Sequence, residues 1–295
     1  MLIASSAQAQ NLFVSDYSEN VYEYTPGGVQ STFAHSGVSV PTGLAFNSAG
    51  DLFVANYTDG NVINEITPGG VVSTFASGLS YPCGLAFNSA GNLFESDFNS
   101  GNIYEFTTSG AKTIFASGLN TPLGLAFNSA GDLFVSEEYS GIITEITPGG
   151  VQSPFASGLS FPWELAFNSA GDLFEADYGS GSIYEFTLGG VRSTFASSTG
   201  WMDGPLGLAF NNAGILFDAA YFSGNIYEFT PSGVRSTFAS GLSPTYLAFQ
   251  GETLPVPEPS ALGLLAVGAT ALLVRRRRFL TNDRSRAKGR SARKQ

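Results

Sequence analysis

Short runs of apolar and aromatic residues alternate with turn-forming residues along most of the chain. Runs such as "GLAF", "DLFVANY", "NIYEFT" and "VRSTFASGL" are rich in β-branched and aromatic residues, and "NSAG" and "TPGG" stand between them. Turn signals recur about every eight to twelve residues, and no apolar run has helical spacing. The pattern therefore predicts an all-β body made of short strands.

These strands are grouped in repeats of nearly constant length. The triplet "LAF" recurs with spacings of 41, 40, 40, 43 and 39 residues. Four antiparallel strands in a unit of about forty residues are typical of a β-propeller blade. Phenylalanine stands at three equivalent positions of six copies, which accounts for 18 of its 25 occurrences. We expect these rings to form the core between stacked blades, because one sheet cannot cover its own two apolar faces.

The two ends of the repeat region complete each other. Residues 11–42 carry a repeat without its first strand, and "YLAFQGE" at 246–252 carries a first strand without the other three. Joining them predicts a six-bladed β-propeller over residues 11–252, in which the C-terminal strand enters the N-terminal blade. Such closure removes the open sheet edges that promote aggregation.

The repeat resembles NHL-type propellers and the wider gluconolactonase-like superfamily. The stretch "TPLGLAFNSAGDLFVSEEYSGIITEITPGG" at 121–150 carries the first-strand and second-strand signatures, and the likeness spans residues 11–252. The third strand differs, because it has glutamate where the family often has basic residues. This argues against the RNA binding of some NHL proteins. The glutamates are Glu23, Glu65, Glu105, Glu145, Glu185 and Glu228.

Charge is divided sharply along the chain. Residues 1–257 hold 22 acidic and three basic residues, so this part carries 3 − 22 = −19, and the other ten basic residues lie in the last 21 positions. A body this acidic repels phosphate backbones, so we expect no nucleic acid as its partner. Cys83 is the only cysteine, which excludes an intrachain disulfide, and it is expected to be a small buried filler.

The segment "VPEPSALGLLAVGATALLVRRRR" at 256–278 resembles a PEP-CTERM sorting segment. The parts are a proline-rich linker at 253–259, an apolar helix with an arginine cluster at 260–278, and a basic tail at 279–295. The resemblance implies a Gram-negative bacterium, a transmembrane anchor in the inner membrane, processing by an exosortase, and delivery to the cell envelope or extracellular space. A basic tail that binds nucleic acid is the alternative for 275–295. The motif residues are Pro257, Glu258, Pro259, Arg275, Arg276, Arg277 and Arg278.

Residues 1–10 are predicted to be the remnant of an export signal. Ala7, Gln8 and Ala9 form an A-x-A cleavage pattern, but no full apolar stretch precedes them. We therefore expect that the true start of the chain lies upstream of Met1, or that the sequence is a fragment.

Variation between repeats is concentrated on the face that carries the blade-to-blade connections. There Trp163 and Glu164 replace smaller residues, and the connection between residues 197 and 205 is three residues longer than its counterpart after Ala76. Aromatic platforms beside carboxylates suit sugar rings. The alternative is that the tryptophans fill gaps between blades. The predicted ligand-binding residues are Glu137, Tyr139, Trp163, Glu164, Trp201, Met202 and Asp203.

Carboxylates also recur near the ends of the second strands. The gluconolactonase-like resemblance implies a divalent metal, and oxygen ligands suit calcium or magnesium. The alternative is that a residue repeated in nearly every blade caps a turn. Glu95, Glu175 and Asp218 are acids that do not recur in every blade, so they discriminate better between a metal site and a turn cap. The predicted metal ligands are Glu95, Asp97, Glu175 and Asp177.

We predict an exported binding or structural module of the cell envelope or extracellular matrix, with carbohydrate or exopolysaccharide as the expected ligand. The alternative is a metal-dependent, lactonase-like hydrolase that uses carboxylates at the propeller channel. His35 is the only histidine and is expected to be exposed, which gives acid–base or nucleophilic catalysis little support. Streptogramin-lyase-like propellers are expected to use histidine-bearing motifs, which this chain lacks.

Overall fold

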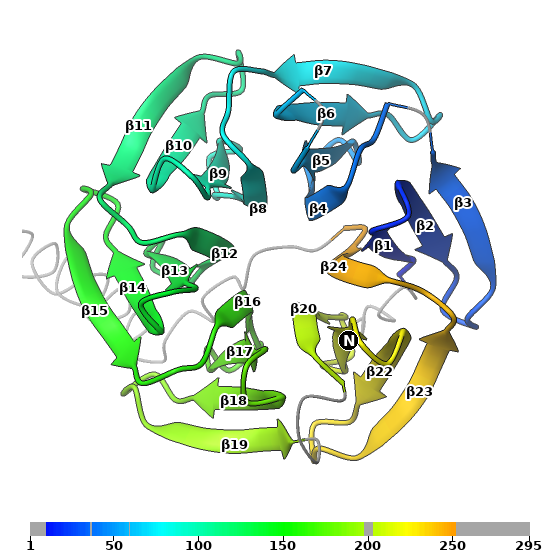
Figure 1. The fold of residues 1–295 in the computed structure, drawn as a ribbon, viewed down its shortest axis with the longest axis vertical. Helices are drawn as coiled ribbons and strands as arrows, with labels where there is room; N and C mark the ends of the chain where they lie inside the picture. Colours follow the sequence, from blue (N-terminus) through cyan, green and yellow to red (C-terminus); the bar gives the residue numbers. More distant parts are fainter. Residues whose placement is uncertain (1–9, 36, 59, 198–202, 252–295) are drawn as a thin grey trace, which may run out of the picture. The chain divides into compact units, whose positions relative to one another are not determined.

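The computed structural model describes residues 10–35, 37–58, 60–197 and 203–251. The only regular secondary structure in these described residues is β-strand. The 24 strands form six antiparallel sheets of four strands each, which are arranged around one axis (Figure 1). The predicted six-bladed β-propeller is confirmed.

The blades are numbered along the chain, and the strands of each are given from the innermost to the outermost. Blades 1 to 3 are β24 (Pro244–Phe249), β1 (Leu12–Asp16), β2 (Asn20–Tyr24) and β3 (Gln30–Ala34); β4 (Pro41–Phe46), β5 (Leu52–Asn56), β6 (Val62–Ile66) and β7 (Val72–Ala76); β8 (Pro82–Phe87), β9 (Leu93–Asp97), β10 (Asn102–Phe106) and β11 (Lys112–Ser117). Blades 4 to 6 are β12 (Pro122–Phe127), β13 (Leu133–Glu137), β14 (Ile142–Ile146) and β15 (Gln152–Ser157); β16 (Pro162–Phe167), β17 (Leu173–Asp177), β18 (Ser182–Phe186) and β19 (Arg192–Ser197); β20 (Pro205–Phe210), β21 (Leu216–Ala220), β22 (Asn225–Phe229) and β23 (Arg235–Ser240).

Blade 1 closes the ring, as the sequence predicts. Strand β24 pairs antiparallel with β1, so that Leu12 lies opposite Phe249 and Val14 lies opposite Leu247. The hydroxyls of Ser15 and Thr245 are 2.9 Å apart in the same pair of strands. The two ends of the repeat region therefore share one sheet, and no innermost strand is left without a partner.

Phenylalanine triplets fill the seams between neighbouring blades. Phe13 of blade 1 meets Phe33 of its own blade at 4.9 Å and Phe46 of blade 2 at 4.8 Å, both edge to face. The same arrangement closes the last seam, where Phe217 of blade 6 contacts Phe238 and Phe249. Each such pair contributes about 0.5–1.5 kcal/mol beyond the burial of its area. The predicted core positions are thus confirmed.

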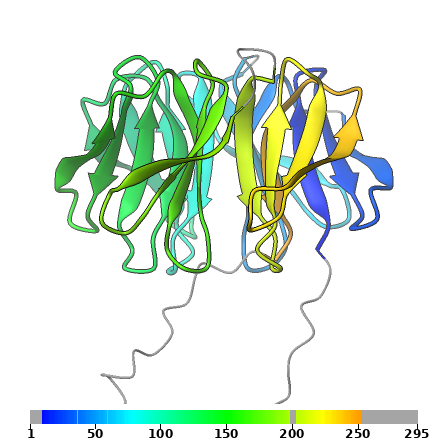
Figure 2. The same ribbon diagram turned by 90° about the horizontal axis from the view of Figure 1, so that it is seen from below.

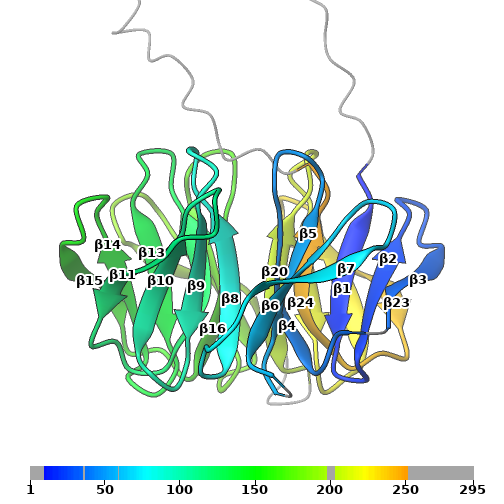
Figure 3. The same cartoon turned by 90° about the horizontal axis from the view of Figure 1, so that it is seen from above.

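The two faces of the propeller carry different connections (Figures 2 and 3). One face, here called the hairpin face, has the "NSAG" and "TPGG" turns, together with the described ends of the chain, where Gln10 Nε2 donates to the carbonyl of Gln250. The opposite face, called the connection face, has the turns between second and third strands and the links between blades. Neither described end of the chain therefore covers the candidate ligand-site residues, which lie on the connection face.

Glycine allows the innermost strands to approach one another. A Cβ at Gly43, Gly84, Gly124 or Gly207 would lie inside van der Waals contact with a backbone carbonyl oxygen of the next blade. Glu164 and Tyr246 hold the equivalent position in the other two blades. The axis is therefore tightly packed at four positions and carries side chains at two.

The first prediction concerns ring closure. A chain that ends at residue 243 lacks β24, so β1 presents an unpaired edge, the seam with blade 6 loses Phe249 and the seam with blade 2 loses Ala248. We expect loss of cooperative thermal unfolding by circular dichroism and self-association in sedimentation velocity. A chain ending at residue 251 is the control and should remain monomeric. Equal melting temperatures for the two chains would contradict the role given to β24.

The second prediction concerns the glycines at the axis. Gly124→Ala forces a methyl group against the carbonyl oxygen of Trp163, so we expect a loss of about 1–3 kcal/mol in the free energy of unfolding. Gly149→Ala in the same blade is the matched control, because its nearest contact is 3.9 Å away. Urea unfolding measures both, and a Gly124 variant as stable as the control would show that the strands can separate freely.

Candidate ligand site at the connection face

Side chains at the ends of the second strands cap the connections beside them. Asp97 Oδ2 accepts the Ser80 N–H at 2.6 Å, and Asp177 Oδ2 accepts the Ser160 N–H at 2.7 Å. Glu137 accepts the Asn120 N–H at 2.7 Å in the same way. The alternative of a repeated turn cap is confirmed. These carboxylates are occupied by backbone donors, as are the corresponding side chains of Asp16 and Asn56.

The six residues that directly follow the second strands form a ring, which the sequence analysis missed. In every blade the backbone N–H of this residue donates to the carbonyl of the residue before the innermost-strand proline, for example from Phe98 to Tyr81 at 3.2 Å. Five of the six are aromatic and the sixth is a glutamate. We call them the collar: Tyr17, Tyr57, Phe98, Glu138, Tyr178 and Tyr221. The signal was an aromatic residue directly after the second strand in five of six repeats.

Further exposed rings extend the collar outward. Tyr139 contacts Phe98 and Phe161, with centroids 6.2 Å apart in each pair, and Phe222 contacts Tyr178 at 5.4 Å and Tyr221 at 5.5 Å. Tyr139 is 63% exposed and Phe222 is 52% exposed. Together with the collar they make a broad aromatic surface on the connection face.

Two exposed aromatic residues next to the collar have a strained backbone conformation. Tyr81 has φ of 59° and Phe161 has φ of 55°, and each precedes a proline. Bulky residues rarely adopt this left-handed conformation, and it costs on the order of 1–3 kcal/mol. Gly204 holds the equivalent position in blade 6 without that strain. Val40 and Thr121 have the same left-handed conformation in blades 2 and 4, so the strain belongs to the position and not to the aromatic side chains.

Trp163, Glu164 and Tyr246 form an axial cluster beneath the collar. Trp163 belongs to blade 5, yet its ring lies 6.2 Å from that of Tyr246 in blade 1, and blade 6 stands between these blades in the ring. The indole therefore reaches across the axis, and it also contacts Tyr178 of the collar at 6.1 Å. Trp163 thus lies across the axis and against the collar.

Two polar atoms of the axial cluster lack protein partners among the described residues. Trp163 Nε1 and the Tyr246 hydroxyl are buried and have no hydrogen-bond partner in the part of the chain that the structure describes. Burial raises the pKa of Tyr246 well above its usual value, and the charges of Glu164 and Glu138 raise it further. The charge of Glu138, whose side chain is half-buried, also raises the pKa values of Tyr57 and Tyr178, in both cases after burial itself. Burial raises the pKa of Glu138 as well.

The structure brings together only part of the predicted ligand site. Trp163 and Glu164 lie at the axis and Tyr139 lies on the aromatic surface, whereas Glu137 is a buried cap. Asp203 lies at the seam between blades 5 and 6, where it pairs with Arg235 at 2.8 Å. Trp201 and Met202 lie outside the described residues.

Among the described residues, no group of three His, Cys, Asp or Glu side chains is placed to hold a metal ion. Glu95 and Asp97 belong to blade 3, and Glu175 and Asp177 belong to blade 5, with blade 4 between them. The carboxylates of Glu95 and Glu175 are fully buried and have no hydrogen-bond partner within the described part of the chain. The bound divalent cation therefore stays a prediction for which the described residues provide no shared site.

Two single residues behave as expected. Cys83 is a buried free thiol, and burial raises its pKa well above the usual value, so it is a protonated filler at neutral pH. His35 is exposed.

The fold defines the class of the molecule, which is a six-bladed β-propeller. Residues 255–278 match the family model of the PEP-CTERM protein-sorting motif. The chain therefore carries this motif, which indicates an exported protein that is anchored through its C-terminal segment before processing and recognised by an exosortase-type sorting enzyme. The motif and residues 1–9 lie outside the described residues, in which no helix is long and apolar enough to cross a membrane.

Solved structures are similar to the propeller in fold. A nidogen/laminin complex aligns with a TM-score of 0.74 at 16% identity, covering 82% of this chain and 98% of that chain. A virginiamycin B lyase from Staphylococcus aureus aligns with a TM-score of 0.60 at 20% identity, covering 71% of this chain and 77% of the lyase chain. A putative gluconolactonase aligns with 0.62 at 13% identity, covering 81% and 92%. No curated protein matches the chain. At these identities the likeness concerns the fold alone.

The third prediction concerns the buried acids. Valine stands in blades 1, 2 and 4 where Glu175 stands in blade 5, so Glu175→Val should raise the free energy of unfolding by about 1–3 kcal/mol at pH 7. Burial raises the folded-state pKa of Glu175 well above the usual value of a glutamate. The folded chain then holds a proton that the unfolded chain releases, so stability falls as pH rises above about 4.5.

Denaturant unfolding from pH 4 upward measures this slope, which the Glu175 variant should flatten. Glu145→Val, which removes the same charge from a partly exposed position, is the control and should leave the slope unchanged. An unaltered slope and stability in the Glu175 variant would mean that its carboxylate has partners in solution.

Proposed function

We propose that this exported propeller is a carbohydrate-binding module of the cell envelope or extracellular matrix, and that it binds its ligand on the collar. The observation that carries the proposal is the aromatic collar over an axial cluster with two unpartnered polar atoms, Trp163 Nε1 and the Tyr246 hydroxyl. The sorting motif supports a location outside the inner membrane.

The chemistry of the surface favours a sugar chain. The apolar faces of sugar rings stack on aromatic side chains, and their hydroxyls bond to nearby polar groups. Tyr139, Phe222 and Tyr17 offer exposed rings, and Glu138 supplies a carboxylate among them. Buried polar atoms without partners cost stability, and a ligand or ordered water that reaches them would offset that cost.

The charge of the body narrows the class of polysaccharide. Residues 1–257 carry −19, and only three basic residues stand in them. A polymer rich in uronic acid or sulfate would be repelled by this field. We therefore favour a neutral exopolysaccharide, or one with amino sugars, as the ligand.

The lactonase-like alternative rests on the similarity of fold to a putative gluconolactonase and on the carboxylates of Glu164 and Glu138 near the axis. It requires a bound metal or a general base. A lactonase assay on the full chain with calcium, magnesium or manganese separates the two functions. Turnover that disappears in Glu164→Gln would establish the hydrolase.

The fourth prediction tests the collar. Replacing both Tyr139 and Phe222 by Ala should weaken binding of a neutral polysaccharide by about tenfold, because two stacking surfaces are lost while the exposed positions leave the fold intact. Leu188→Ala on the hairpin face, where Leu188 is 75% exposed, is the matched control and should bind normally. Affinity electrophoresis in dextran, galactomannan and chitosan measures the effect.

Fluorescence gives a second readout. In a Trp201→Phe background Trp163 is the only tryptophan, so its emission should shift when polysaccharide binds on the collar. Equal affinity of the double variant and the control, or no retention by any of the three polymers, would refute the proposed function.

A further inference from the structure

Three blades share a column of side chains on one sheet face. An acid on the second strand lies directly opposite a tyrosine on the third, and a cation from the fourth strand lies over the tyrosine ring. The columns are Glu95, Tyr104 and Lys112 in blade 3, Glu175, Tyr184 and Arg192 in blade 5, and Asp218, Tyr227 and Arg235 in blade 6. They contain all three basic residues of the propeller sequence.

The column of blade 6 differs in two ways. In blades 3 and 5 the cation also donates to a backbone carbonyl in the connection from the preceding blade, from Lys112 to Gly78 and from Arg192 to Gly158. Arg235 of blade 6 instead forms an ion pair with a side chain, that of Asp203, in the connection between blades 5 and 6. Its buried acid is also an aspartate, Asp218, which is one methylene shorter than glutamate. The seam in front of blade 6 is therefore filled less completely.

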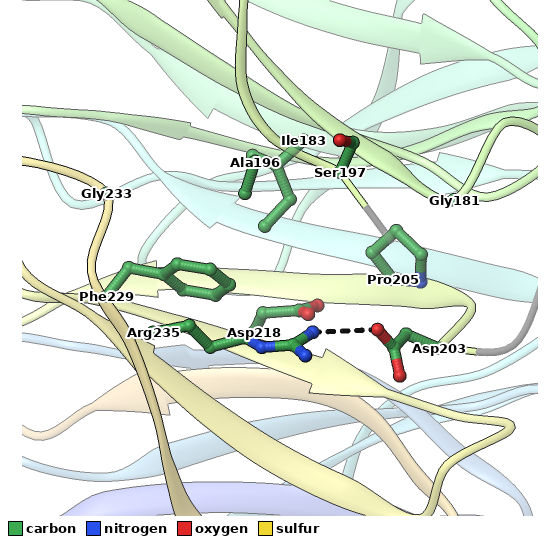
Figure 4. A pocket seen from close by; sticks show the side chains of 10 residues that line it. All are labelled: Gly181, Ile183, Ala196, Ser197, Asp203, Pro205, Asp218, Phe229, Gly233 and Arg235. Atoms are coloured by element: carbon green, nitrogen blue, oxygen red, sulfur yellow. Dashed lines mark hydrogen bonds and ion pairs between the residues drawn. The ribbon is translucent and has the colours of Figure 1, made fainter. Parts of the chain in front are cut away.

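A cavity of about 240 Å³ occupies that seam (Figure 4). Ile183 and Ala196 of blade 5 line one side, and Asp218, Phe229 and Arg235 of blade 6 line the other. Asp218 is 3% exposed, and its Oδ1 has no hydrogen-bond partner among the described residues. In Figure 4 its carboxyl lies between Phe229, Arg235 and Asp203, facing the space that Ile183 and Pro205 border. A buried acceptor thus faces an unfilled space.

We propose that this cavity is a binding site for one small neutral polyhydroxy ligand, such as a single sugar ring, whose hydroxyls bond to Asp218 and Arg235. The size suits one ring, because pockets for drug-sized ligands measure about 300–1,000 Å³. The apolar side chains of Ile183, Ala196 and Phe229 suit the face of the ring. The site is separate from the collar and does not depend on the function proposed there.

The charges at the cavity favour a neutral ligand. Asp203 and Arg235 compensate each other in their ion pair. Burial raises the pKa of Asp218 to about 8, so its carboxyl is mostly neutral at pH 7. An anion would face the acids, and a cation would face Arg235. The Asp203–Arg235 pair is partly exposed and costs little to rearrange, so it leaves a route for the ligand to enter.

The experiment is a titration of the full chain with small probes, followed by methyl NMR of Ile183 and Ala196. The probes are methyl glucoside, methyl galactoside and myo-inositol, with acetate and methylammonium as charged comparisons. We expect at least one neutral probe to shift both signals saturably at millimolar concentration. Asp218→Val should weaken this binding by roughly tenfold or more, because it removes a hydrogen-bonded carboxyl.

Glu175→Val is the matched control, since it removes a buried acid from the same strand position of blade 5 and should leave the binding unchanged. The double variant of Tyr139 and Phe222 should also leave it unchanged, which separates this site from the collar. The proposal is overturned if no neutral probe shifts the two signals, if only a charged probe does, or if Asp218→Val binds as well as the unmodified chain.

Discussion

Burial of phenylalanine triplets between neighbouring blades is the interaction on which the rest of the structure depends. Each sheet has two apolar faces, and only the next blade covers them, so the fold is stable only as a closed ring. The pairing of β24 with β1 provides the sixth seam and places Phe249 against Phe217. Ring closure then brings the innermost strands so near to one another that glycine is required at four positions around the axis.

Departures from the repeat are informative because the repeat itself is structural. Glu164 and Tyr246 replace two of the axial glycines, and Glu138 replaces an aromatic residue of the collar. All three lie at the connection face. Because each occurs in only one blade, the collar and the axial cluster present different side chains in different blades. A ring of six identical blades would offer a ligand six equivalent contacts, whereas these substitutions give the face one orientation.

The three basic residues of the propeller also mark blades that depart from the repeat. Each of Lys112, Arg192 and Arg235 stands in a blade that buries an acid on its second strand, and each lies over the tyrosine beside that acid. The cation lowers the pKa of the acid while burial raises it, and burial is the larger effect. A buried carboxyl without partners is costly, so the columns are retained at the expense of stability.

The sequence by itself determined the architecture, because the spacing of "LAF", the turn signals and the split repeat fix the strand count and the closure locally. It also identified Trp163, Glu164 and Tyr139, which differ from their counterparts in other repeats. Only the tertiary structure revealed that Trp163 crosses the axis to Tyr246, that Asp97 and Asp177 cap backbone groups, and that a cavity lies beside Asp218. Those contacts join residues of different blades or of distant connections, so their geometry depends on how the blades pack once the ring is closed, and the pattern within one repeat does not encode it.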